Sequence, residues 1–263
     1  MTKKVGLSLS SGGARGLAHI GVIKTLRKHN IPIDCISGTS MGALVGAYYA
    51  LHAEIELLEK MALGFKKKRD VLRIVDLNNP KKSIVKGNKV RRFLSKYYGN
   101  KTFRDTKIPL SIGTTNINTA EQVILTSGKL ITAALASATI PGIFPPIKHR
   151  NRYLVDGGLV DFAPVGLVKK MGAEVIISVE ISTTKYPKME KYDTMSILER
   201  VYEIFMSNTL KLEDREYTKN IIVLRPQTGS RFNMFSFYNS EKYIRAGEIE
   251  AEKYIKKIKR MIK

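Results

Sequence analysis

Ser40 stands in a sequence that could present a nucleophilic hydroxyl. The run Gly38-Thr39-Ser40-Met41-Gly42 has the Gly-X-Ser-X-Gly spacing, and it lies between a short strand-like segment and an apolar helix-like segment. In such a turn the glycines let a strand bend sharply into a helix, so that the serine hydroxyl stands clear of the backbone. The spacing therefore predicts a nucleophile elbow. A glycine-rich turn with a capping serine is the alternative that the pentapeptide alone leaves open.

A second glycine-rich segment lies one strand–helix unit before the elbow and reads Ser11-Gly12-Gly13-Ala14-Arg15-Gly16. Its glycines allow the backbone to approach a ligand and to point N–H groups at it, as in a phosphate cradle or an oxyanion hole. The segment lacks the Gly-Lys-Ser/Thr ending of a P-loop, and a serine replaces the first glycine of the dinucleotide fingerprint. With a candidate nucleophile close by, the pattern favours an oxyanion hole.

A nucleophilic serine also needs a base. The chain has four histidines, and in the α/β-hydrolase order of serine, acid and histidine only His149 could serve. That residue lies in a strongly basic run, residues 148–152, which would oppose formation of an imidazolium. In addition, α/β-hydrolases build several strands before the elbow, whereas one strand–helix unit precedes Ser40. We therefore expect His149 to lie on the surface and His19 to be a packing or orienting residue.

Carboxylates are the remaining candidate bases. Asp156 follows a strand-like segment and precedes Gly157 and Gly158, so it can approach other backbone without steric conflict. An ordinary turn aspartate is the alternative reading of this position. Asp161 lies in the same turn and is its nearest rival, whereas Asp34 comes only four residues before the elbow and should lie below it.

The segments that would hold these residues alternate between strand-like and helix-like patterns. This alternation predicts one α/β domain over residues 1–263 with a mostly parallel sheet. The expected strands are Val5–Leu9, Ile33–Ile36, Leu110–Asn116, Val123–Thr126, Tyr153–Val155, Val175–Val179 and Ile221–Leu224. The expected helices are Gly16–His29, Met41–His52, Lys129–Ser137, Val165–Met171, Met195–Tyr217 and Lys242–Ile262.

Taken together and in order, three motifs resemble those of the patatin-like phospholipases: the Gly-Gly-X-Arg-Gly loop, the Gly-X-Ser-X-Gly elbow and the late Asp-Gly-Gly. The segment Ala136–Pro146 is similar to the run that precedes the last motif in that family, and the matches cover residues 5–180. The resemblance implies a three-layer α/β/α sandwich and hydrolysis of phospholipid, lysophospholipid or related lipid esters. It also implies a Ser-Asp dyad that works without histidine, metal or organic cofactor.

Carried over residue by residue, the resemblance makes Ser40 the nucleophile and Asp156 the base of an acyl-enzyme mechanism. It places the oxyanion hole at Gly12, Gly13, Ala14 and Arg15, the elbow glycines at Gly38 and Gly42, and further motif glycines at Gly16, Gly157 and Gly158. The chain departs from the family at Ser11, where a glycine is common. It also departs at Asp161, where bacterial relatives often carry asparagine. A lipid acyltransferase or a regulatory lipid-binding protein on the same fold is the alternative.

Composition limits the surroundings in which this chemistry could work. The chain has 263 residues, 43% of them hydrophobic, a formal charge of +22 and a pI of about 10.0. These values exclude a disordered chain and a membrane-spanning one. The single cysteine, Cys35, excludes a disulfide framework and fits a reducing compartment. We expect a cytoplasmic protein that can contact the inner face of the membrane peripherally.

The positive charge is concentrated in two blocks. Residues 65–108 are expected to form a basic insertion, either an irregular solvated one or a cap over the site, with a net charge of +12 between residues 66 and 107. Residues 241–263 are expected to form a basic amphipathic helix, docked on the core or on a membrane surface. A charge of this sign attracts nucleic acid or anionic lipid. Since no nucleic-acid-binding motif is present, an anionic membrane is the expected partner and nucleic acid is not.

Overall fold

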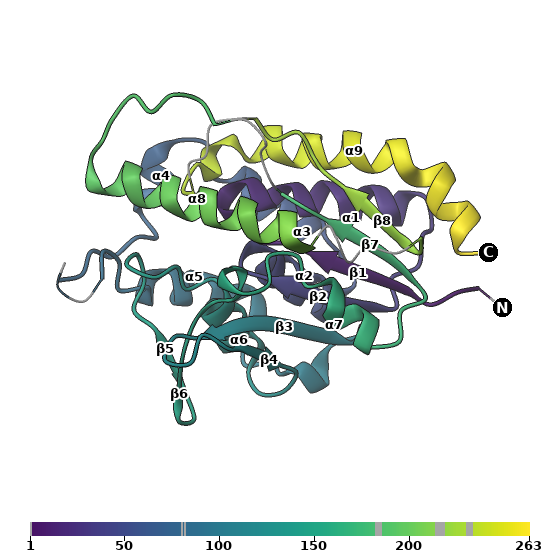
Figure 1. The fold of residues 1–263 in the computed structure, drawn as a ribbon, viewed down its shortest axis with the longest axis horizontal. Coiled ribbons are helices and arrows are strands. Elements are labelled where there is room, and N and C mark those ends of the chain that lie inside the picture. Colours follow the sequence, from purple (N-terminus) through teal and green to yellow (C-terminus); the bar gives the residue numbers. More distant parts are fainter. Residues whose placement is uncertain (1, 80, 82, 182–185, 214–218, 230–233) are drawn as a thin grey trace.

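A computed structural model describes residues 2–79, 81, 83–181, 186–213, 219–229 and 234–263 (Figure 1). Its centre is an eight-stranded sheet with the order β5-β6-β3-β2-β1-β7-β8, and β4 pairs with β3. The strands are β1 (Val5–Leu9), β2 (Cys35–Thr39), β3 (Leu110–Asn116), β4 (Gln122–Leu125), β5 (Ile147–His149), β6 (Arg152–Asp156), β7 (Val175–Val179) and β8 (Ile221–Leu224). The pairs joining β3, β2, β1, β7 and β8 are parallel, and those of β4, β5 and β6 are antiparallel.

Helices cover both faces of this sheet (Figure 1). They are α1 (Ala18–Lys28), α2 (Met41–His52), α3 (Glu56–Leu63), α4 (Lys68–Leu72), α5 (Asn88–Tyr98), α6 (Leu130–Ser137), α7 (Val165–Lys170), α8 (Thr194–Glu213) and α9 (Ser240–Met261). The main core joins one face of the sheet to α1, α2, α6 and α9, and a smaller cluster joins the other face to α7. The predicted three-layer α/β/α class with a mostly parallel sheet is confirmed.

The strands closest to the candidate site are buried on both faces. Every residue of β1, β2 and β3 is buried. A strand that is covered on both sides needs a near-continuous apolar or small-residue run, which is what the sequence supplies here. The expected bounds of β1, α2 and β3 agree with the structure, whereas β2 begins two residues later than expected and continues to Thr39, directly before the elbow.

The basic insertion is more regular than an irregular solvated loop. Residues 65–108 contain α4 and the three-turn helix α5, and Leu77 forms an isolated bridge with Val85. Basic residues dominate the outer side of α5, while Leu94 and Tyr98 are buried on its inner side. Helix α3 and strand β5 were not predicted from the sequence. Residues 214–217, which it assigned to the end of a long helix, lie outside the described residues.

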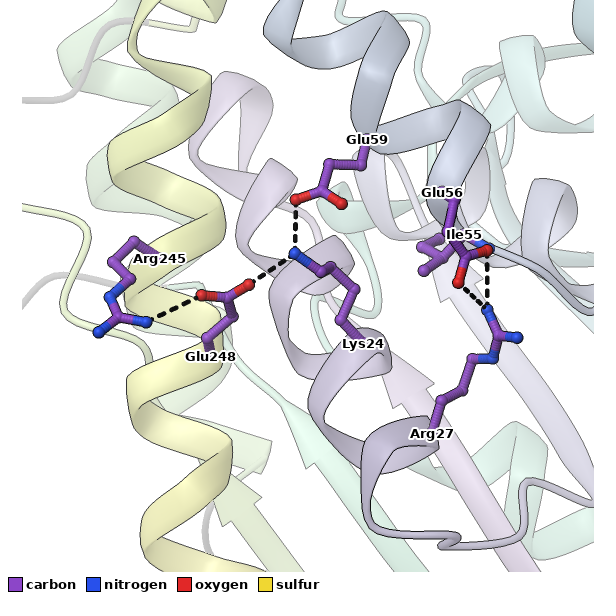
Figure 2. Close-up of polar contacts among 7 residues, drawn as sticks. All are labelled: Lys24, Arg27, Ile55, Glu56, Glu59, Arg245 and Glu248. Carbon is purple, nitrogen blue, oxygen red and sulfur yellow. Dashed lines mark hydrogen bonds and ion pairs between the residues drawn. The ribbon is translucent and has the colours of Figure 1, made fainter.

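The C-terminal helix α9 is docked on the core. Its apolar side, which includes Ile244, Ala251 and Ile258, is buried against α1. Figure 2 shows the polar contacts at this junction, where Lys24 Nζ of α1 donates to Glu59 Oε1 of α3 at 2.6 Å and to Glu248 Oε1 of α9 at 2.7 Å. The apolar face of α9 is therefore covered by the protein itself, although many of its lysines remain exposed. Within the described residues, no helix combines the length and apolar character needed to cross a bilayer.

Candidate active site

Ser40 occupies the tight turn between β2 and α2. Its backbone angles are φ 55° and ψ −119°, a conformation that a residue other than glycine adopts only under strain. Its Oγ donates a hydrogen bond to Asp156 Oδ2 at 2.6 Å. This contact removes the capping alternative, because the side chain turns to the carboxylate instead of the first turn of α2.

The two glycines of the elbow are required by close backbone contacts. A Cβ atom at Gly42 would lie 2.1 Å from the carbonyl oxygen of Leu9, and one at Gly38 would lie 2.5 Å from the carbonyl oxygen of Gly42. Real Cβ atoms do not approach oxygen so closely. The Gly-X-Ser-X-Gly spacing is therefore a packing requirement of this turn, in which β1 and the start of α2 touch backbone to backbone.

Strand β3 explains why Ser40 and Asp156 meet across 116 residues of sequence. Thr39, the last residue of β2, pairs with Gly113, and Asp156, the last residue of β6, pairs with the next residue, Thr114. Strand β4 occupies one edge of β3 over the same residues. Strands β2 and β6 therefore both pair with the other edge of β3, one after the other along its length. The ends of β2 and β6 therefore converge on one point of the sheet.

Ser137 at the end of α6 fixes the elbow to the sheet. The Ser40 N–H donates to Ser137 Oγ at 2.8 Å, and Ser137 Oγ donates to the Gly113 carbonyl at 2.6 Å. Residue types and spacing alone do not indicate this bridging role. The only signal for it was the position of Ser137 within the segment that resembles the family.

Asp156 is a fully buried carboxylate at the end of β6. Burial raises its pKa from 3.8 to about 6, because a charged carboxylate loses its hydration there. Two hydrogen bonds oppose this rise in pKa, one from the Ser40 hydroxyl and one from the Gly158 N–H at 2.8 Å from Oδ1. The nearby Tyr202 hydroxyl also lowers the pKa of Asp156. The group is thus a stronger base than a free aspartate and still ionised at neutral pH.

Tyr202 of α8 and Ser11 of the glycine loop are neighbours of this pair that sequence reasoning did not identify. The Tyr202 hydroxyl lies close enough to Asp156, Ser11 and Ser40 for all three to affect its pKa, which burial raises well above 10.0. Neither Tyr202 Oη nor Ser11 Oγ has a hydrogen-bond partner of good geometry among the residues that the structure describes. Nothing in the sequence pattern distinguishes Tyr202 from other residues of its helix.

The glycine loop forms a 3₁₀ turn, Gly13–Leu17, beside the elbow. The Ala14 N–H donates to the Met234 carbonyl at 3.1 Å, so the structure does not support Ala14 as an oxyanion donor. Within the described residues, no backbone carbonyl accepts the N–H of Gly12 or Gly13. Of the predicted donors Gly12, Gly13 and Ala14, the first two are therefore the ones whose amides have no backbone acceptor in the described part of the chain.

Arg15, the fourth residue expected at the oxyanion hole, points into the protein. Its guanidinium is buried and lies 3.5 Å from Glu203 Oε1 of α8, measured from Nη1. Burial lowers the pKa of Arg15, and the charge of Glu203 opposes that change. Of the two roles open at the sequence level, added positive charge and a lock on the loop, this geometry favours the lock.

The other sequence candidates lie away from the pair. Buried His19 contacts the Ser10 carbonyl through Nε2 at 2.9 Å, and burial lowers its pKa to about 4, so it orients the start of the glycine loop as a neutral ring. His149 lies on β5 beside a separate surface hollow. Asp161 Oδ2 accepts from Gln122 Nε2 at 2.6 Å, and Asp34 Oδ2 accepts from the Val5 N–H at 2.6 Å, at the opposite end of β1 from the elbow.

An apolar cavity of about 260 Å³ opens directly on Ser40. Its walls come from the start of α2, from α6 and the segment after it, from residues 234–237, and from the basic insertion. The insertion contributes Val71, Ile74, Val75 and Val90 together with two cations, Lys86 and Arg91. A long hydrocarbon chain with a polar, anionic end would fit the chemistry of these walls.

Known proteins resemble this chain over the region that contains the site. The family model described as patatin-like phospholipase matches residues 7–169. Lysophospholipase NTE1 of Pyricularia oryzae is 36% identical over 197 residues, which are 74% of this chain and 13% of that protein. Lysophospholipase nte1 of Emericella nidulans is 28% identical over 281 residues, covering 98% of this chain and 18% of that protein. The chain thus spans between about one eighth and one fifth of the length of these curated relatives.

Among solved structures, VipD from Legionella pneumophila shares the fold with a TM-score of 0.55 at 14% identity. The likeness covers 97% of this chain and 67% of that one. The stretch matched by the family model, residues 7–169, includes the glycine loop, the elbow and the Asp-Gly-Gly turn.

Proposed function

Since the chain belongs to the patatin-like phospholipase family, we propose that it hydrolyses acyl esters of phospholipids or lysophospholipids through Ser40 and Asp156. The observation that carries this proposal is the 2.6 Å hydrogen bond from Ser40 Oγ to Asp156 at a strained elbow beside an apolar cavity. The relatives named as lysophospholipases support the same class of substrate.

In the proposed reaction Ser40 Oγ attacks the ester carbonyl carbon while its proton passes to Asp156 Oδ2. The tetrahedral intermediate then collapses, the bond from the carbonyl carbon to the alcohol oxygen breaks, and the proton moves from Asp156 to the departing alkoxide. The alcohol portion of the lipid leaves, and the acyl group stays on Ser40. A water molecule next attacks the carbonyl carbon of the acyl-enzyme while Asp156 accepts its proton. The second tetrahedral intermediate then collapses, the bond from the carbonyl carbon to Ser40 Oγ breaks, and the proton moves from Asp156 to Ser40 Oγ. The fatty acid leaves, and Ser40 and Asp156 are regenerated.

The oxyanion of each intermediate is proposed to bind backbone amides at two helix beginnings. The free N–H groups of Gly12 and Gly13 and the N–H of Met41, the residue after the nucleophile, supply the donors. The N-terminus of α2 adds its partial positive charge at the same place. Loss of one such donor typically lowers kcat by about 10²–10³.

The cavity is proposed to hold the acyl chain, and the basic insertion to act as its cap. Apolar side chains of residues 71–90 form part of the wall, so an acyl chain there would be removed from water. Lys86 and Arg91 lie in the same wall and are suited to the phosphate of a phospholipid or lysophospholipid. This arrangement favours phosphorylated lipids over neutral esters.

Release of free fatty acid from a panel of phospholipids, lysophospholipids and neutral glycerides tests the proposal. The wild-type chain should release fatty acid, and Ser40→Ala and Asp156→Asn should each lose at least about a thousandfold of the rate. His149→Ala serves as the matched control and should keep the wild-type rate, because that ring lies in a separate hollow. Fatty-acid release that survives in Ser40→Ala would contradict the proposal. Transfer of the acyl group to an added alcohol in place of water would assign the chain to acyl transfer.

A further inference from the structure

Helix α8 carries apolar side chains on its exposed side as well as on its buried side. Its inner side, which faces the site, buries Tyr202, Glu203, Met206, Ser207 and Leu210. Its outer side exposes Ile197, Leu198, Val201, Ile204 and Phe205. A surface helix of a protein in water normally carries charged and polar groups on its outer side.

The exposed apolar residues form one continuous stripe, called here the α8 stripe (Ile197, Leu198, Val201, Ile204 and Phe205). Their spacing of one, four, seven and eight residues places them on a single side of the helix. Val201 is 58% exposed and Phe205 44% exposed. Single exposed apolar residues need no explanation, whereas a contiguous stripe of this kind marks a surface that is covered by a partner.

The α8 stripe belongs to the end of the molecule that contains the cavity. The inner side of α8 packs into a cluster with Ile140 and Met234, and both of these residues line the cavity. Figure 1 shows α4, α5 and α8 together toward the left of the view. Leu72 and Leu77, which are 66% and 75% exposed, follow cavity-lining residues of the insertion and add apolar surface at this end.

Charge identifies what covers this surface. The insertion beside it has fifteen basic and three acidic residues between residues 66 and 107. A partner that offers a hydrocarbon interior below an anionic surface complements both features, and an anionic phospholipid bilayer has this structure. A second copy of the chain would instead bring two equally basic surfaces together, which electrostatic repulsion opposes.

We propose that the α8 stripe, together with Leu72 and Leu77, is the surface by which the protein docks on an anionic phospholipid bilayer. The stripe enters the headgroup region, and the basic residues of the insertion contact lipid phosphates around it. The purpose of docking, delivery of lipid to the cavity, rests on the proposed function. Docking itself is a binding event and can be measured without catalysis.

The test uses the full chain with Ser40→Ala, so that vesicles are not consumed. Binding to sedimented vesicles of equal parts phosphatidylglycerol and phosphatidylcholine is compared with and without Val201→Gln and Phe205→Gln. Glutamine keeps good helix propensity and removes the apolar surface. The double change should weaken vesicle partitioning at least about tenfold, because binding no longer transfers two half-exposed apolar side chains from water into the bilayer.

A matched control makes the same chemical change elsewhere. Leu57 on α3 and Ile249 on α9 are each 49% exposed, and replacing both with glutamine should leave partitioning within about twofold of the parent. Vesicles of phosphatidylcholine alone should bind the parent at least about tenfold more weakly, since the basic residues lose their anionic partners. Circular dichroism verifies folding, and Ile197→Gln with Ile204→Gln provides a second pair if the first pair fails to fold.

Three results would overturn the docking surface. They are unchanged partitioning of the α8 variants, no vesicle binding by the parent chain, and a concentration-dependent dimer that the α8 changes abolish. Hydrolysis of a water-soluble short-chain nitrophenyl ester, measured with Ser40 intact, separates the two proposals. The α8 variants should retain this activity, whereas its absence from the wild-type chain would count against the proposed function and not against docking.

Discussion

Replacement of Asp156 by asparagine is expected to stabilise the fold near neutral pH and to abolish catalysis. The carboxylate is fully buried, and burial raises its pKa from 3.8 to about 6. At about 1.4 kcal/mol for each tenfold change in an equilibrium constant, this difference corresponds to about 3 kcal/mol. The protein therefore carries a destabilising charge at the position where a base is needed.

The sign of the effect follows from proton binding. Between pH 3.8 and about pH 6 the folded protein holds a proton on Asp156 that the unfolded chain has lost. The free energy of unfolding consequently falls as pH rises through this range, and the full loss of about 3 kcal/mol is present by about pH 7. In Asp156→Asn this contribution is absent at every pH.

Urea unfolding of both proteins at several pH values from about 4 to 7, followed by circular dichroism, measures the difference. The unfolding free energy of Asp156→Asn relative to wild type should increase by about 2 kcal/mol from the lowest to the highest pH, because the unfolded chain has already lost most of this proton at about pH 4. Ser40→Ala is the control: it keeps the carboxylate and removes a donor that lowers its pKa, so its pH dependence should persist. Parallel curves for wild type and Asp156→Asn would refute the reasoning.

Three further predictions concern the same site. For a soluble ester, kcat/KM should fall about tenfold between pH 8 and pH 5, because a base with a pKa of about 6 is only about one tenth ionised at pH 5; a flat profile would argue against Asp156 as the base. Tyr202→Phe removes a hydroxyl that lowers the pKa of Asp156, so the midpoint of that pH profile should move upward, and a downward or absent shift would show that the phenol has no such effect. Gly42→Ala should lower the melting temperature severely or prevent folding, since the new Cβ would lie 2.1 Å from the Leu9 carbonyl oxygen, whereas Gly166→Ala, with open space around it, should melt within a few degrees of wild type.

Local pattern was sufficient for the elements that surround the site. The apolar run of α2 and the run of apolar, small and β-branched residues in β3 were placed at their observed bounds, because elements buried on all sides contain no charged residues. The elbow could also be predicted, since its two glycines are demanded by contacts within the strand–turn–helix unit and with the adjacent β1. Helix α3, strand β5 and the helical part of the insertion lack so clear a signal, and they were missed.

The contacts that complete the site depend on long-range register. Ser137 meets the Ser40 amide only because α6 ends beside β3, and Tyr202 reaches Asp156 only because α8 lies over the turn that follows β6. Neither of these two contacts can be predicted from the spacing of residues in the sequence. The approach of β2 and β6 along one edge of β3 also depends on long-range register. The pairing of Ser40 with Asp156 was therefore predicted from the family resemblance and not from residue spacing.

An amphipathic pattern likewise does not reveal which surface contacts the apolar side of the helix. The pattern of α9 was compatible with a membrane or with the core, and the structure shows α1 against its apolar side. In α8 a row of apolar residues faces outward while Glu203 and Ser207 are buried beside Met206 and Leu210, and only the fold reveals this orientation. The proposed membrane surface therefore moves from the C-terminal helix to α8.

Covalent trapping with a fluorophosphonate probe tests most directly the central claim, that Ser40 is a nucleophile activated by Asp156. The probe reacts with an activated serine, and its reaction does not depend on which lipid is the substrate. Peptide mass spectrometry should find a single adduct on Ser40, which the Ser40→Ala protein lacks. Labelling of Asp156→Asn should be at least about a hundredfold slower, since the base that accepts the Ser40 proton is gone. An adduct on another residue, or equal labelling rates in wild type and Asp156→Asn, would contradict the account.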